Sequence, residues 1–118
     1  MKVMVIDDSQ MVRTMVGRAL AGSGYTVVEA IDGTDALIKL AINADTRLVV
    51  CDVNMPRMSG IEFLEALNHR GSTVPVVMLT TEGQPELIQR AKTLGAKGWI
   101  VKPFKPEMLL AVARKLAA

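Results

Sequence analysis

The residues of this chain that could do chemistry follow short apolar segments, at points where a strand would end. They are three carboxylates, two hydroxyls and one ammonium, in the order Asp7, Asp8, Asp52, Thr80, Thr81 and Lys102. Carboxylates that converge on one spot raise each other's pKa, which costs stability unless a cation lies among them. If the fold brings these segment ends together, the set favours a cation site, although Asp8 or Ser9 alone could simply cap a helix.

An all-oxygen set of this kind suits a hard cation. Carboxylates that leave coordination sites for water and phosphate favour Mg²⁺. A carboxylate beside Mg²⁺ and a lysine can attack phosphorus and form an aspartyl phosphate. Asp52 stands alone at its segment end and is the candidate nucleophile. Asp7 and Asp8 are adjacent and are predicted to hold the metal, with Lys102 neutralising charge during transfer.

Five apolar segments alternate with helical patterns and so predict five βα units. The segments cover residues 3–6, 26–29, 48–51, 75–79 and 98–101, and four of them are nearly continuous in apolar residues, as in parallel strands buried on both faces. The more polar segment 26–29 better suits a sheet edge. Apolar residues at helical spacing lie between the segments, with Thr34 a plausible cap of the second helix and Pro85 and Pro106 in the first turns of the last two.

This alternation predicts an α/β fold, a single doubly wound five-stranded parallel sheet with five helices. The expected strand order is 2-1-3-4-5, taken by analogy with flavodoxin-like sheets. In that order the first and third strands are neighbours, and ligands bind beyond their carboxyl ends. The predicted fold therefore brings Asp7, Asp8 and Asp52 together.

Composition limits the class of protein. A chain of 118 residues suits one domain, expected over 1–118, and half of its residues are hydrophobic. No apolar run approaches the ~20 residues that span a bilayer, so we expect a cytoplasmic protein without membrane insertion. The single Cys51 cannot form an internal disulfide. Net charge is +2 with no basic block, which disfavours direct nucleic-acid binding.

Four motifs resemble those of response-regulator receiver domains of two-component systems. They are Asp7-Asp8-Ser9, then CDVNMPRMSG at 51–60, VVMLTTEG at 76–83 and WIVKPF at 99–104. Each is weak alone, but the four occur in order over essentially the full chain. The motifs are most similar to those of the single-domain, CheY-like regulators of chemotaxis.

The resemblance implies roles for individual residues. Asp7 and Asp8 match the acids that organise Mg²⁺, Asp52 matches the phosphoacceptor and metal ligand, and Asn54 matches the position whose backbone carbonyl completes the metal site. Thr80 matches the switch hydroxyl. Lys102, which precedes Pro103, matches the family lysine, and a cis Lys102–Pro103 bond would aim its ammonium at the phosphoryl group.

Two further positions concern switching and lifetime. Trp99 matches the aromatic switch, which is usually Tyr or Phe, and the larger indole could either work as a rotamer switch or simply pack over the surface. Asn54 and Glu82 match the positions that tune dephosphorylation, and the pair looks like that of single-domain chemotaxis regulators. His69 is expected on the surface of the third helix.

The resemblance implies a stand-alone regulator that takes a phosphoryl group from a histidine kinase. It would be no enzyme beyond its own phosphorylation and dephosphorylation, a monomer or weak dimer, and would signal to a downstream protein through a face within 84–116. The alternatives are a phosphotransfer intermediate and a phosphorylation-independent receiver-like interaction module. A flavodoxin-type carrier would need a phosphate loop where Asp7 and Asp8 stand, and an aspartyl phosphatase would need different acid spacing and a cap.

Overall fold

The computed structural model describes residues 1–81 and 85–117 and contains a five-stranded parallel sheet with five helices. The strand order is β2-β1-β3-β4-β5, with every neighbouring pair parallel, so the predicted fold is confirmed. The elements, in chain order, are β1 (Lys2–Ile6), α1 (Gln10–Gly22), β2 (Thr26–Ala30), α2 (Gly33–Ile42), β3 (Thr46–Asp52), α3 (Gly60–His69), β4 (Val76–Thr80), α4 (Pro85–Thr93), β5 (Gly98–Val101) and α5 (Pro106–Leu116).

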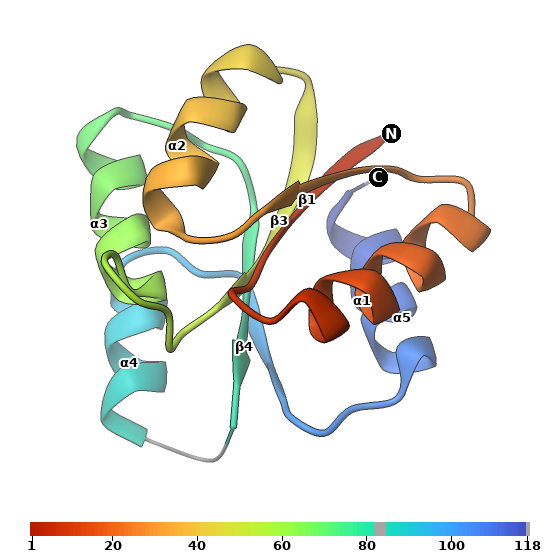
Figure 1. Ribbon diagram of the computed structural model, residues 1–118. Coiled ribbons are helices and arrows are strands. Elements are labelled where there is room, and N and C mark those ends of the chain that lie inside the picture. The colour runs from red at the N-terminus through yellow and green to blue at the C-terminus, as the bar shows by residue number, and fades with distance from the viewer. Residues whose placement is uncertain (82–84, 118) are drawn as a thin grey trace.

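The sheet lies between two helical layers, with α1 and α5 on one face and α2, α3 and α4 on the other (Figure 1). Successive side chains of a strand point to opposite faces. Val3 and Val5 accordingly pack with α1 and α5, whereas Met4 and Ile6 pack with the other three helices. Both faces of β1 are therefore buried, which is why its sequence is continuously apolar. The edge strand β2 is only partly buried, as its polar sequence predicted.

The helix ends follow local capping chemistry. The Ser9 hydroxyl accepts from the Val12 N–H at the start of α1, and Ser59 forms a reciprocal capping box with Glu62 at the start of α3. The prediction that Thr34 caps α2 was wrong. The cap is Asp32, whose carboxylate accepts from the Asp35 N–H at 2.8 Å.

The apolar stripe of α1 is narrower in the structure than in the sequence. The predicted stripe included Met11 and Met15, but these side chains are 80% and 41% exposed, whereas Val16 and Leu20 are buried. Only that narrow strip of α1 faces the core beside α5. Within residues 1–81 and 85–117, no helix has both the length and the apolar character needed to cross a membrane.

Candidate functional site

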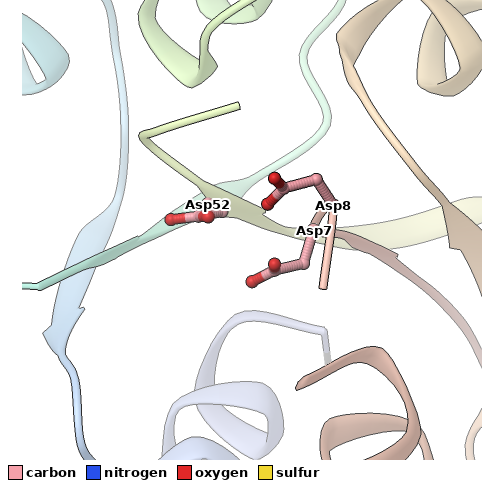
Figure 2. Close-up of side chains that lie close together, drawn as sticks. All are labelled: Asp7, Asp8 and Asp52. Atoms are coloured by element: carbon pink, nitrogen blue, oxygen red, sulfur yellow. The ribbon is translucent and has the colours of Figure 1, made fainter. Parts of the chain in front are cut away.

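Three carboxylates meet where β1 and β3 end. These strands are neighbours, with Ile6 aligned to Cys51, so the acids that follow them share one rim of the sheet. Asp7, Asp8 and Asp52 each offer an oxygen within 4.8 Å of the others (Figure 2). Asp7 and Asp52 are buried, whereas Asp8 is exposed to solvent. The strand order thus assembles a compact acidic cluster from residues 45 positions apart in the sequence.

Lys102 joins the cluster from the end of β5. Its ammonium donates to Asp7 Oδ2 at 3.0 Å and lies 3.4 Å from Asp52 Oδ1. Strand alternation explains this reach, because Val5, Val50 and Ile100 pack on the same face of the sheet. The residues two positions further on, Asp7, Asp52 and Lys102, continue on that face. The peptide bond between Lys102 and Pro103 is cis.

The turn after β1 is held by hydrogen bonds to Asp7. Its Oδ1 accepts from the Ser9 N–H at 2.9 Å, and its backbone carbonyl accepts from Arg13 Nη1 at 2.6 Å. Arg13 also donates to Glu29 on β2 at 3.2 Å. Asp7 is therefore fixed by the start of α1, which leaves its orientation toward Asp52 little freedom.

Burial and neighbouring charge perturb the titrating groups of the site. Burial, followed by the charge of Asp7, raises the pKa of Asp52, and Lys102 opposes this only in part. Burial disfavours the ammonium of Lys102, but its hydrogen bond to Asp7 and the two carboxylate charges outweigh this and raise its pKa. In this site the Asp52 carboxylate is destabilised by burial, whereas the neighbouring Lys102 ammonium is stabilised in its protonated form.

Two buried oxygens at the rim have no hydrogen-bond partner among the described residues. They are Asp52 Oδ1 and Thr80 Oγ1, and the two residues are only 5% and 4% exposed, respectively. A buried hydroxyl or carboxylate without a partner is uncommon in native proteins and costs stability. The Lys102 ammonium forms an ion pair with Asp52 Oδ1 at 3.4 Å without a hydrogen bond, so this atom and the Thr80 hydroxyl can both still bind a group that enters the site.

The donor set fits a hard divalent cation. It consists of carboxylate oxygens alone, close enough for one ion to contact all three, and one of the buried oxygens lacks a hydrogen bond. Asn54, two residues after Asp52, lies in the exposed loop between β3 and α3. The resemblance to receiver domains implies that the backbone carbonyl of this residue completes the metal site.

The other predicted residues lie away from the acids or outside the described residues. Trp99 lies on β5 with 36% of its surface exposed, and Lys92 Nζ is 4.3 Å from the centre of its ring. In this arrangement the indole packs over the surface between α4 and β5. His69 is exposed at the end of α3. Glu82 falls outside the described residues.

Sequence reasoning missed three polar residues around the site. It found nothing comparable after the second strand, yet Asp32 there is buried and paired with Arg57, with Arg57 Nε and Nη2 at 2.9 and 2.8 Å from Asp32 Oδ2. Arg13, which braces Asp7, was also missed. The available signal was an aspartate two residues after a strand and directly before a helical pattern, which is typical of a helix cap. No comparable signal identifies the two arginines, because Arg57 pairs with an acid 25 residues away and Arg13 donates to a backbone carbonyl, which no residue type marks.

Known proteins resemble this chain in sequence and in fold. Residues 3–114 match the response regulator receiver domain. The chain is 38% identical over 112 residues to the chemotaxis protein CheY1 of Helicobacter pylori, covering 92% of this chain and 90% of that one. It is 36% identical over 116 residues to the response regulator MprA of Mycobacterium avium, covering 98% of this chain but half of that longer protein.

A solved structure agrees closely. That of the Vibrio cholerae chemotaxis protein CheY4 is 44% identical, with a TM-score of 0.90, and the match covers 98% of this chain and 97% of that one. Proteins of this type are signalling proteins. The chain belongs to the response-regulator receiver-domain family of two-component signalling and is similar to the CheY proteins of chemotaxis.

Proposed function

We propose that this chain is a phosphorylation-activated response regulator whose phosphoacceptor is Asp52. The observation that carries the proposal is the juxtaposition of a buried carboxylate, Asp52, with the Lys102 ammonium at 3.4 Å and two further acids. The Asp52 Oδ1 atom would attack the phosphorus of a phosphohistidine on a histidine kinase. The histidine nitrogen would leave, and an acyl phosphate would form on Asp52.

The residues around Asp52 would divide the work of charge neutralisation. Asp7, Asp8, Asp52 and the Asn54 carbonyl would hold Mg²⁺, which when bound supplies positive charge opposite the phosphoryl oxygens. Lys102 already lies between two carboxylates and would shift toward a phosphoryl oxygen. The dephosphorylation rate would be tuned from Asn54 and from Glu82.

Thr80 would transmit the modification. Its buried hydroxyl has no partner in the described part of the chain and could donate to a phosphoryl oxygen. Phosphorylation adds negative charge and acceptor oxygens, which would favour a loop arrangement with Thr80 drawn toward Asp52. Trp99, on the neighbouring strand, would either turn inward with Thr80 or stay in its surface position.

The output surface would be α4, β5 and α5. Its exposed apolar side chains are Trp99, Val101 and Met108, with Lys92 stacked on the indole. The two helices also carry the exposed basic residues Arg90, Arg114 and Lys115. A basic, apolar surface suits a protein partner with acidic and apolar side chains. The similarity to CheY proteins favours a partner of the chemotaxis type and a cytoplasmic location, with the chain acting as a monomer or weak dimer. A phosphotransfer intermediate would use the same acceptor chemistry but would not signal to a partner through that surface.

The decisive experiment is intact-mass measurement after incubation with a small acyl-phosphate donor. We expect one phosphoryl adduct with Mg²⁺ and none with EDTA. Asp52→Asn should give no adduct, whereas Asp45→Asn, the same change at an exposed acid on the opposite rim, should be modified like the wild type. An unmodified wild-type chain, under conditions that modify a known receiver domain, would overturn the proposal and favour a phosphorylation-independent binding module.

A further inference from the structure

The Asp32–Arg57 ion pair spans the end of β1, where the acidic cluster lies. Asp32 follows β2, and Arg57 lies in the loop between β3 and α3. Because β1 lies between β2 and β3, a bond between these two loops passes over the carboxyl end of β1. The backbone bond from the Asp7 N–H to the Ala30 carbonyl, 3.1 Å, ties the same region of β2 to the acid pair. The ion pair therefore lies on the same rim of the sheet as the proposed metal site.

The chain accepts two local costs to make this contact. Arg57 has a φ of 66°, the only positive φ of a non-glycine residue in the described part of the chain, and a residue with a Cβ is strained there. Asp32 is 3% exposed, and a buried carboxylate is unfavourable without partners. The Asp35 N–H and the Arg57 guanidinium are those partners, and together, in that order, they hold the pKa of Asp32 below its usual value against burial.

The loop that Arg57 closes has fixed ends and an exposed middle. The Val53 N–H donates to the Leu79 carbonyl at 3.0 Å, and the Val53 carbonyl accepts from the Gly60 N–H at 2.9 Å. Between these anchors, Asn54 and Pro56 are exposed. Within the described residues, Arg57 Nε makes the only side-chain hydrogen bond between this loop and the start of α2, and Nη2 adds an ion-pair contact to the same carboxylate.

A second contact supports the same closure. A Cβ on Gly33, the first residue of α2, would lie 2.7 Å from the Cγ and Sδ atoms of Met58. The side chain next to Arg57 thus packs directly against the start of α2. Both contacts hold the loop against α2, and the loop carries Asn54 only three residues before Arg57.

We infer that Asp32 and Arg57 form a latch that positions the β3–α3 loop, and with it the Asn54 carbonyl, for binding of a divalent cation. Both are positioning residues, since neither belongs to the acidic cluster. This inference rests on the proposed function, because it concerns the metal site of the same phosphoacceptor. It adds a determinant of cation affinity that lies on elements other than those carrying the acids.

Positioning and simple electrostatics make opposite predictions for Arg57. Removing a positive charge near an acidic site should strengthen cation binding by electrostatics alone. Loss of the latch should weaken it. Arg57→Asn is the suitable change, because asparagine tolerates a positive φ and so keeps the backbone form of the loop. Asp32→Asn keeps a side-chain oxygen that can cap α2.

The test is calorimetric titration of the unphosphorylated protein with Mg²⁺, using the wild type, Arg57→Asn and the double variant Asp32→Asn/Arg57→Asn. The double variant has the same net charge as the wild type. We expect the dissociation constant to rise about threefold or more in both variants, somewhat below the ~10- to 100-fold typical of direct outer-shell partners. Arg70→Asn, an exposed arginine at the opposite end of α3, should change it less than about twofold.

The outcomes separate the latch from the function on which it rests. Tighter binding by Arg57→Asn, or wild-type affinity in the double variant, would overturn the latch and leave the metal site intact. A wild-type chain that binds no Mg²⁺ would overturn the proposed function and the latch together. Unfolding midpoints measured in parallel would confirm that each variant is folded at the titration temperature, so that a weaker affinity reports the site itself.

Discussion

Replacing Asp52 with asparagine should stabilise the fold when no divalent cation is present. The Asp52 carboxylate is buried within 4.8 Å of two other acids and 3.4 Å from the Lys102 ammonium. At an effective dielectric constant of about 20, each repulsion destabilises the fold by about 3.5 kcal/mol and the attraction stabilises it by about 5 kcal/mol. The repulsions exceed the attraction by about 2 kcal/mol, and solvent around the exposed Asp8 reduces this to about 1–2 kcal/mol.

The measurement is thermal and urea unfolding of both proteins in EDTA at pH 7. A gain of 1–2 kcal/mol corresponds to a rise in Tm of about 4–8 °C for a domain of this size. Asp45→Asn is the matched control, because Asp45 is an exposed acid whose pKa is lowered by its hydrogen bond from Lys2. It should give no stabilisation. If Asp52→Asn were neutral or destabilising, the balance of charges derived from these distances would be wrong.

The pH dependence of this gain has a defined sign. The pKa of Asp52 is raised above 3.8, chiefly by burial and by the charge of Asp7, so the folded protein binds a proton there more readily than the unfolded chain. The penalty is therefore fully present above the raised pKa and disappears as pH falls toward 3.8. The difference in unfolding free energy between the two proteins should shrink over that range. Mg²⁺ at ten times its dissociation constant should add about 1.4 kcal/mol to the wild type and remove most of the difference at pH 7.

Three further substitutions test other parts of the site. Lys102→Met should lower the free energy of unfolding by about 3 kcal/mol in EDTA at pH 7, because it leaves Asp7 and Asp52 without a counter-charge. Calorimetry should nevertheless show tighter Mg²⁺ binding, because the ammonium no longer competes with the metal. Weaker binding would contradict this competition. Gly60→Ala should lower the free energy of unfolding in urea by about 1–3 kcal/mol and slow phosphorylation, because a Cβ there would lie 2.5 Å from the Asp52 carbonyl oxygen. An unchanged free energy would show that the loop has room for the methyl group. Thr80→Val should raise the unfolding free energy by about 1 kcal/mol, because it removes a buried hydroxyl that has no described partner. It should also abolish any phosphorylation-dependent change in Trp99 fluorescence, and an unaltered fluorescence response would exclude Thr80 as the transmitter.

The fold was predictable because its three central strands, β1, β3 and β4, are buried on both faces, although β5, also expected to be buried on both faces, buries only Ile100. The segments 3–6 and 48–51 are continuously apolar, and in the structure their side chains alternate between the two core clusters. Once the order of five parallel strands is given, the meeting of Asp7 with Asp52 follows without further information. The pairing of Lys102 with both of them follows from strand alternation on the same face.

Other details depend on tertiary contacts that periodicity does not encode. Asp32 and Thr34 are both acceptable caps, and nothing local decides between them. Asp32 is the cap in a structure where the distant Arg57 also pairs with it and keeps the buried charge compensated. Likewise, helical spacing marks Met11 as apolar, but only the packing of α1 beside α5 determines that this side chain lies outside the core.

The unfavourable features of the rim are also the features that suit it to switching. Asp52 is buried as an anion among like charges, and Thr80 is buried without a described partner, so the fold carries costs that a cation and a phosphoryl group could each relieve. A bound group can bias a conformational equilibrium only by the free energy that distinguishes its interactions with the two states. Under the proposed function, a substitution that removes one of these unfavourable features also removes the free-energy difference on which switching depends. Asp52→Asn and Thr80→Val should therefore each give a more stable chain that is unable to signal, as expected where stability and function compete for the same residues.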